Sequence, residues 1–160
     1  MKRREALLGL GALALSRAVR ATPVPSLPLA TDLRADGRIA ARRGVPMVVL
    51  FSLAGCPYCE AVRRSHLAPL LREGQQAKRL LLRQVDLGAS KPLVDFAGIR
   101  TTHGEFARSR GVRIAPVVSF WDGQGREIAA SLEGMLLPDF YGAYLDASLE
   151  AAQRALRARR

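Results

Sequence analysis

The sequence predicts an α/β fold with a central mixed sheet of four to five strands flanked by helices. Two nearly continuous apolar runs, residues 47–53 and 80–87, are separated by a segment with helical spacing, which indicates two parallel strands joined by a crossover helix. Residues 112–121 and 126–132 flank Asp-Gly-Gln-Gly, a turn sequence typical of a β-hairpin. A β–α–β unit followed by a hairpin and a closing helix makes a small sheet with helices on both faces.

Helices in the first half of the chain are predicted from the spacing of apolar residues. Residues 33–43 are expected to form a short helix that is interrupted near Asp36-Gly37. Residues 59–71 carry apolar side chains at helical spacing. Pro69 lies within that segment, so we expect it to kink the helix or to end its first part.

The second half of the chain is expected to hold a loop and two further helices. Residues 88–101 lack a clear periodicity and are predicted to be a loop. Thr102 and Glu105 have the spacing of a capping box, which predicts a short helix over residues 102–110. Residues 138–157 are predicted to form a long final helix with a proline near its start.

Length and composition indicate one domain with a substantial core. The chain has 160 residues, of which 49% are hydrophobic. Its formal net charge is +11, but the basic residues are scattered and no aromatic residues interleave with them. We therefore expect surface arginines that contact solvent and no binding of nucleic acid.

The N-terminus has the pattern of an export signal. Lys2-Arg3-Arg4 precedes an apolar stretch at residues 6–15, which is too short for a comfortable membrane span, and Ala18 and Ala21 each close a small-residue cleavage pattern. Cleavage after Ala21 would leave 20 basic and 13 acidic residues. The arginine pair loosely resembles a twin-arginine signal. An uncleaved, membrane-anchoring start is the alternative.

These patterns divide the chain into four expected parts and predict a periplasmic location. They are a signal peptide (1–21), an N-terminal extension (22–44), the folded domain (45–152) and a basic C-terminal tail (153–160).

Chemistry is indicated by the only two cysteines, Cys56 and Cys59, which lie between a predicted strand and a predicted helix. A helix start stabilises a thiolate, and a second thiol one turn on can attack a mixed disulfide formed by the first. Cys56 is thus the expected nucleophile and Cys59 the expected resolving thiol. A disulfide closing so small a loop would stabilise the fold little. An inert disulfide or two free core cysteines remain the structural alternatives.

Three segments together resemble the thioredoxin superfamily, and the resemblance covers about residues 45–149. The segments are Cys56-Pro57-Tyr58-Cys59, residues 111–120 around Ala115-Pro116, and the hairpin at residues 121–127. Among subfamilies, the chain is most similar to exported thioredoxin-like proteins of the SoxW type, which are associated with sulfur oxidation and envelope thiol reduction.

The resemblance implies a thiol–disulfide oxidoreductase and assigns further residues to its site. Pro116 is expected to be cis and to face the cysteine pair, with an ordinary edge-strand proline as the alternative. Pro57, Tyr58, Ala115 and Pro116 are the expected substrate-binding residues, although Tyr58 has plain packing as an equal alternative. The expected partners are protein thiols and disulfides, together with a membrane transporter of reducing equivalents. No cofactor and no metal are expected, and the chain is expected to be a monomer.

Two departures from thioredoxin accompany the resemblance. Leu50 stands six residues before Cys56, where thioredoxin has a buried Asp that accepts a proton, so water, Glu60 or a substrate group would have to help. The Pro-Tyr dipeptide is that of glutaredoxins, but their Gly-Gly glutathione site is absent. The alternatives that remain are a disulfide oxidase or isomerase and a copper-binding chaperone that would use Cys56, Cys59 and His103.

Overall fold

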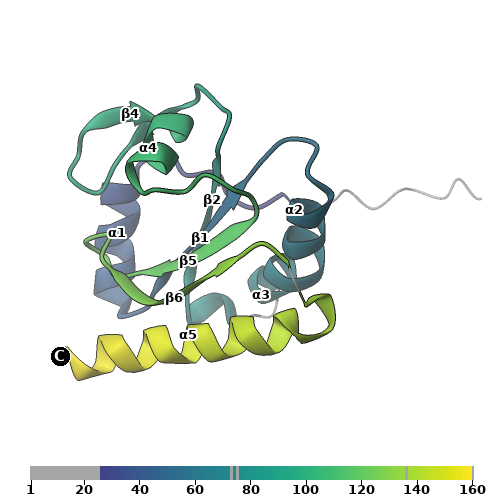
Figure 1. Cartoon of the computed structure of the whole chain (residues 1–160). Helices are drawn as coiled ribbons and strands as arrows, with labels where there is room; N and C mark the ends of the chain where they lie inside the picture. The colour runs from purple at the N-terminus through teal and green to yellow at the C-terminus, as the bar shows by residue number, and fades with distance from the viewer. Residues whose placement is uncertain (1–25, 73, 75, 136, 160) are drawn as a thin grey trace, which may run out of the picture.

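A central sheet of four strands organises the residues described by the computed structural model, which are 26–159 apart from 73, 75 and 136. The strand order is β2-β1-β5-β6, with β1 parallel to β2 and antiparallel to β5, and with β5 antiparallel to β6 (Figure 1). The mixed sheet with helices on both faces confirms the predicted fold class. The strands are β1 (Met47–Ser52), β2 (Leu81–Asp86), β5 (Val117–Trp121) and β6 (Glu127–Glu133).

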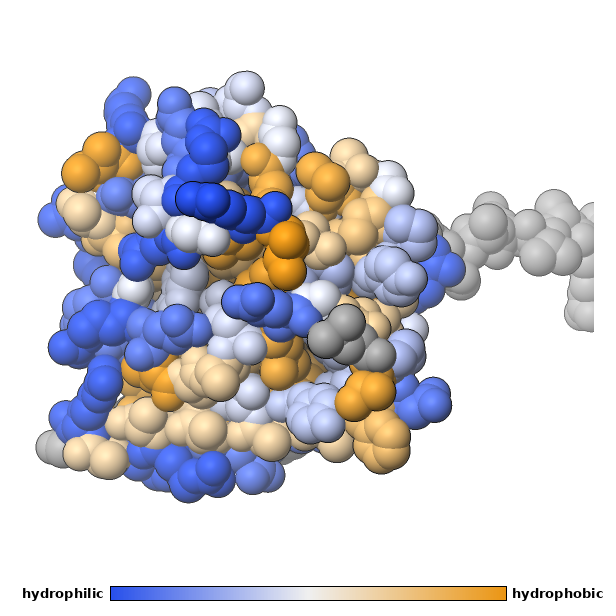
Figure 2. Space-filling model, in the orientation of Figure 1, coloured by the Kyte–Doolittle hydropathy of each residue, from blue (hydrophilic) through white to orange (hydrophobic). Residues whose placement is uncertain are grey.

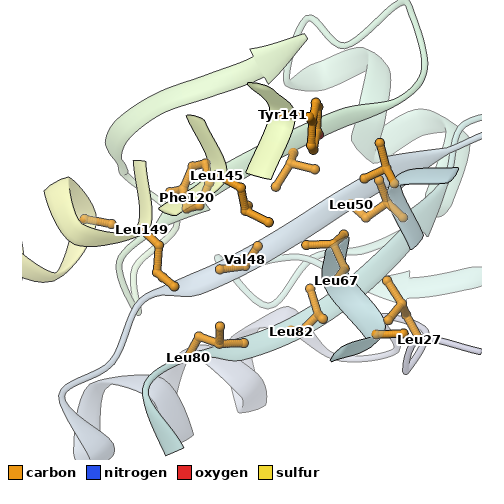
Figure 3. Packing of buried hydrophobic residues seen from close by; sticks show 14 residues of the cluster. Leu27, Val48, Leu50, Leu67, Leu80, Leu82, Phe120, Tyr141, Leu145 and Leu149 are labelled. Atoms are coloured by element: carbon orange, nitrogen blue, oxygen red, sulfur yellow. The ribbon is translucent and has the colours of Figure 1, made fainter. Parts of the chain in front are cut away.

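One face of the sheet is covered by the helices that follow the cysteine pair and by the last helix. Alternate residues of β1 and β5, among them Leu50 and Phe120, pack there against Leu67 and Leu145 (Figure 3). The helical elements on this face are α2 (Pro57–Ala61), the π-helical turn η1 (Val62–Leu67), α3 (Ala68–Arg72) and α5 (Tyr141–Ala158). Short 3-10 turns, η2 (Gln76–Lys78) and η3 (Pro138–Phe140), precede β2 and α5.

The opposite face is covered by α1 (Leu33–Arg43) and α4 (His103–Ser109). Phe51 of β1 lies 5.8 Å from the ring of Trp121 and 6.3 Å from that of Phe106, measured between ring centroids. Trp121 is therefore a core residue. Leu33 and Ala40 of α1 are also buried, so this helix packs as part of the domain core.

Helix α1 is continuous through Asp36-Gly37, and the predicted interruption is wrong. Local propensity disfavours glycine and aspartate inside a helix, but tertiary contacts outweigh it here. A Cβ on Gly123 would lie only 2.5 Å from the carbonyl oxygen of Gly37, so the two backbones touch at this point. The carboxylate of Asp36 accepts a hydrogen bond of 2.7 Å from Arg83 Nε on β2.

Residues 88–101 contain two short strands, which corrects the predicted loop. Strands β3 (Pro92–Val94) and β4 (Arg100–Thr102) pair antiparallel in a small second sheet. Gly98, with a φ of 87°, provides the left-handed residue between them. Strands of three residues are too short to produce a recognisable alternation of apolar and polar residues.

The helical segment after the cysteines continues past Pro69, but it changes from the π-helical turn η1 to α3 at Leu67–Ala68, so its first part ends beside this proline as predicted. The turn η1 directly precedes α3, and the Ala68 N–H bonds to the carbonyl of Arg63, five residues back. Such a wide turn accommodates a proline ring that would clash with the carbonyl of an ordinary helical turn.

The capping box at the start of α4 is present as predicted. Glu105 N–H donates to the Thr102 hydroxyl at 3.3 Å, and Thr102 N–H donates to the Glu105 carboxylate at 3.1 Å. Helix α5 also begins near its predicted start, and it extends to Ala158, into the segment we described as a basic tail.

The predicted signal peptide and its cleavage sites lie outside the described residues. Within residues 26–159, no helix is both long enough and apolar enough to cross a membrane.

Tyr141 in α5 has a buried hydroxyl without a hydrogen-bond partner among the described residues. Burial raises the pKa of this hydroxyl to about 12. Replacing Tyr141 with Phe removes an unsatisfied polar group at nearly constant volume. We therefore expect Tyr141→Phe to raise the free energy of unfolding by about 1 kcal/mol in a urea titration.

The control for this substitution is Tyr144→Phe, because Tyr144 lies on the same helix and is exposed. Its stability should stay within about 0.5 kcal/mol of the wild-type value. If Tyr141→Phe lowered stability, the hydroxyl would have to make a favourable interaction.

Candidate active site

The cysteine pair is located at the N-terminal end of α2, directly after the loop that leaves β1. Cys56 is the N-cap residue of α2, and its Sγ accepts a hydrogen bond of 3.1 Å from the Cys59 N–H. The two cysteines form a disulfide, with their Cα atoms 5.2 Å apart. Pro57 occupies the first turn of the helix, where its missing N–H costs nothing. The helix starts here because Cys56 supplies the cap and Pro57 presets the backbone.

The two sulfurs differ in their access to solvent. Cys59 is fully buried, whereas Cys56 is partly exposed. A partner disulfide can therefore reach Cys56 but not Cys59. Because free N–H groups at a helix start favour negative charge, the accessible sulfur is also the better placed of the two to become a thiolate.

Ala115 and Pro116 lie next to the pair, although they are almost 60 residues away in sequence. The Ala115–Pro116 bond is cis, as predicted, and the Ala115 carbonyl oxygen lies 4.0 Å from Cys56 Sγ. Pro116 is buried directly before β5, and its carbonyl accepts a hydrogen bond of 2.8 Å from Gly134 N–H. The structure thus brings together the loop after β1, the loop before β5 and the residue after β6.

Exposed apolar side chains are located in the segments that carry the site. Tyr58, inside the Cys-x-x-Cys motif, is 61% exposed, and Pro57 is exposed beside it. Leu53 precedes the cysteines and Ile114 precedes Ala115, and both are exposed. Further hydrophobic surface lies over the N-terminal end of α5, where Leu137 and Phe140 are exposed (Figure 2). We call Leu53, Tyr58 and Ile114 the apolar rim.

Leu50 is fully buried, so an aliphatic side chain occupies the position of thioredoxin's buried acid. Polar side chains lie beside it, on β1 and on the neighbouring strand β2. Ser52, at the end of β1, is buried and pairs in register with Asp86 of β2. Gln84 of β2 is also buried and pairs in register with Leu50.

Arg63 of η1 connects these polar groups to the helix that carries the cysteines. Its Nη2 donates to Ser52 Oγ at 2.9 Å, and its Nε donates to Gln84 Oε1 at 3.0 Å. Its Nη1 forms an ion pair with the Glu60 carboxylate. Glu60, which we considered as a helper for the proton, is thus engaged by Arg63 and is about half exposed.

The hydrogen-bonded side chains continue across the ends of the strands to Lys91. We call these residues the polar set: Ser52, Arg63, Gln84, Asp86 and Lys91. Gln84 Nε2 donates to Asp86 at 2.6 Å, and Lys91 Nζ donates to the other Asp86 oxygen at 2.7 Å. Burial alone would raise the pKa of Asp86, but hydrogen bonds from Lys91 and Gln84 and the charge of Lys91 lower it overall. Sequence reasoning missed this set. The sequence feature that could have indicated it is the presence of polar residues near the ends of two otherwise apolar strands, namely Ser52 on β1 and Gln84 and Asp86 on β2.

Among the described residues, neither histidine lies in a group that could bind a metal. His103 is buried, where its Nδ1 accepts from the Asp86 N–H at 3.0 Å and its Nε2 lies 2.7 Å from the Ala30 carbonyl oxygen. His66 packs against the Tyr141 ring, and burial lowers its pKa despite the opposing charge of Asp146. In the part of the chain that the structure describes, no three His, Cys, Asp or Glu residues are placed to hold a metal ion.

The thioredoxin fold, with a disulfide-bonded Cys-x-x-Cys at a helix start, supports a thiol–disulfide oxidoreductase. A family model described as a thioredoxin-like domain matches residues 33–149. The chain therefore belongs to the thioredoxin-like domain family.

Solved structures of low sequence identity share this fold. The Fasciola hepatica thioredoxin has 15% identity and a TM-score of 0.53, and the match covers 78% of this chain and 97% of that one. Mitochondrial thioredoxin 3 from Saccharomyces cerevisiae, in its oxidized form, has 15% identity and a TM-score of 0.50, with 78% and 93% covered. The comparison with curated proteins gave no significant match.

Proposed function

We propose that this protein is an exported oxidoreductase that reduces disulfides in other proteins through a dithiol–disulfide cycle of Cys56 and Cys59. The observation that carries this proposal is the pairing of an accessible Cys56 sulfur with a fully buried Cys59 sulfur at one helix start. An inert structural disulfide would need neither that asymmetry nor the adjacent Ala115 backbone.

The reaction requires no group beyond the two cysteines and the substrate disulfide. The Cys56 thiolate attacks one substrate sulfur, the substrate S–S bond breaks, and the other substrate sulfur leaves as a thiolate. Cys59 then gives its proton to water or to the departed substrate thiolate and attacks Cys56 Sγ, which releases the second substrate sulfur as a thiolate. Two electrons pass to the substrate, and the Cys56–Cys59 disulfide forms. Its reduction by an external dithiol closes the cycle.

Substrate binding is assigned to the surface around Cys56. An extended peptide can pair with the backbone at Ala115 like an added strand, as in other strand-addition complexes. Pro57, Tyr58 and Pro116 would contact the segment that carries the substrate sulfur. The apolar rim favours unfolded or loosely folded protein substrates, since these expose apolar side chains. We expect the protein to act as a monomer.

The direct test of this function is reduction of the insulin disulfides by purified protein, with dithiothreitol as the electron source. We expect insulin to precipitate well before it does in the control reaction that contains dithiothreitol alone. A rate equal to that control would contradict the proposed function.

The direction of electron flow is proposed to be reductive, as in the SoxW-type proteins that the sequence resembles, with electrons supplied by a membrane transporter of thiol equivalents. We expect the purified pair to have a reduction potential nearer to about −270 mV, as in thioredoxin, than to about −120 mV, as in the oxidase DsbA. Equilibration with glutathione buffers measures it. A reduction potential close to that of the oxidase would contradict the reductive direction and would indicate a disulfide oxidase.

Export to the periplasm is proposed from the N-terminal pattern of a basic start, an apolar stretch and small residues up to Ala21. When the full chain is expressed in a Gram-negative bacterium, the periplasmic fraction should contain a mature form that begins at Thr22. A full-length protein confined to the cytoplasm would contradict export without affecting the redox proposal.

A further inference from the structure

We propose that Arg63 is a positioning residue that holds a fixed positive charge beneath the active-site helix and thereby favours the thiolate form of Cys56. The inference rests on the proposed function, since it concerns how the same cysteine pair is tuned. It assigns a role to the polar set that occupies the region next to Leu50, where thioredoxin has its buried acid.

Three neighbours fix the Arg63 guanidinium in place. Its hydrogen bonds to Ser52 and Gln84 are 2.9 and 3.0 Å long, and Glu60 pairs with its third nitrogen. Only 12% of the Arg63 side chain is exposed. A guanidinium stays charged at every pH at which the protein is folded, so this charge is permanent.

Arg63 lies on the helical segment that carries both cysteines. Arg63 follows Cys59 by four residues, which puts the two side chains on one face of neighbouring helical turns. Its partner Ser52 ends the strand from which the chain leads to Cys56, four residues later. Cys59 on this segment and Leu50 on β1 are both fully buried. Because buried apolar surroundings screen charge poorly, the field of Arg63 acts there more strongly than in water.

The other charged groups around the site are more exposed than Arg63. Glu60 has 48% of its side chain exposed, so solvent screens its negative charge more than it screens that of Arg63. Asp86 of β2 is paired with Lys91. The loop before β5 contributes Arg113 and the end of β6 contributes Glu133, and both are exposed. Arg63 is thus the least exposed charge of the set and is expected to dominate the local field.

A fixed positive charge has a defined chemical consequence for the pair. It stabilises the Cys56 thiolate, which is the reacting form, and so raises the fraction of reactive sulfur at neutral pH. It also stabilises the reduced state relative to the disulfide, which makes the pair more oxidising than it would be without the charge.

The experiment uses the thiol titration of Cys56 in reduced protein that carries Cys59→Ala, so that a single thiol reacts. The rate of alkylation by iodoacetamide is measured as a function of pH for Arg63→Gln, Arg63→Lys and Glu60→Gln. The matched control is Arg64→Gln. Arg64 is the exposed neighbour on the same turn, and its substitution removes the same positive charge. Far-UV circular dichroism and thermal unfolding check that each variant is folded.

We expect Arg63→Gln to raise the midpoint of the alkylation profile enough to lower the thiolate fraction at pH 7 about threefold to tenfold. Arg63→Lys should retain most of the wild-type midpoint, and Arg64→Gln should leave it within about 0.2 units, because solvent screens that charge. Glu60→Gln should lower the midpoint, since it removes the only carboxylate hydrogen-bonded to Arg63 among the described residues.

Equal shifts in Arg63→Gln and Arg64→Gln would overturn the proposal. If Arg63→Gln does not fold, Glu60→Gln decides alone, and an unchanged or raised midpoint would refute the role of Arg63. The titration uses no protein substrate, so it separates the two proposals. A failed insulin assay with the expected shifts rejects only the proposed function, and an active protein without the shifts rejects only the role of Arg63.

Discussion

Cys56→Ala is expected to abolish the reduction of protein disulfides, with turnover falling to the rate of dithiothreitol alone. Cys56 is the only sulfur of the pair that a partner can reach, because Cys59 is fully buried beneath it. Without Cys56 no mixed disulfide can form at the surface, and none of the side chains around the site can replace a thiolate nucleophile. The measurement is the insulin assay, carried out at equal protein concentrations.

Cys59→Ala is the matched counterpart, since it leaves the attacking sulfur in place and removes the one that resolves the intermediate. We expect a mixed disulfide between Cys56 and the substrate to accumulate, visible as a mass increase on non-reducing gels and by mass spectrometry. Undiminished turnover in Cys56→Ala would sink the mechanism. Mixed disulfides of Cys59 in that variant would show that the two roles are reversed.

Asp122→Ala is expected to have the largest effect on stability, lowering the free energy of unfolding by about 3 kcal/mol. Asp122 is buried at the start of the β5–β6 turn, where its carboxylate accepts from the N–H groups of Gln124 and Arg126 at 2.9 and 3.0 Å. The same carboxylate pairs with the side chains of Arg126 and Arg159. Alanine leaves these donors without their acceptor, which is among the more costly single changes in a folded protein.

Urea titration measures this loss, and Asp139→Ala is the control because Asp139 is exposed and has no ion pair in the part of the chain that the structure describes. The control should change stability by less than about 0.5 kcal/mol. A loss below 1 kcal/mol for Asp122→Ala would show that the turn holds without the carboxylate.

Acid titration of the same variant gives an independent reading of Asp122. Burial alone would raise its pKa, but hydrogen bonds from Arg126 and Gln124 and the charge of Arg126 lower it below the ordinary value of 3.8. The stability that these contacts provide is therefore present above about pH 3.8 and is lost as the pH falls from there through the folded-state pKa. The free energy of unfolding of Asp122→Ala should therefore fall less steeply than that of the wild type over that pH range.

Those parts of the fold that depend on local pattern were predictable from the sequence. Strands β1 and β2 are apolar runs between turn signals, and α4 begins at a capping box. The position of Cys56 at a helix start followed from a strand–Cys–helix order. The cis Ala115–Pro116 bond was not derivable from local pattern, and it was predicted correctly only through the resemblance to thioredoxin.

Features that depend on contacts between distant residues were not predictable. Helix α1 continues through Gly37 because Gly123 lies against it, and a single sequence does not indicate that contact. The hydrogen bond from Arg63 to Gln84 joins residues 21 positions apart, on a helix and a strand whose relative placement is set by the whole core. The sequence showed that Leu50 stands where thioredoxin has its buried acid, but not that Arg63 is hydrogen-bonded to Ser52 and Gln84 beside it.

The central claim is that Cys56 and Cys59 exchange reversibly between disulfide and dithiol within the folded protein. It is tested most directly by equilibrating the protein in thiol–disulfide buffers of graded potential and counting free thiols by alkylation and mass spectrometry, with circular dichroism recorded in parallel. We predict one two-electron transition, with both cysteines alkylated together and the far-UV spectrum unchanged. A disulfide that is reduced only when the protein unfolds would contradict the account and would make the pair a structural bond.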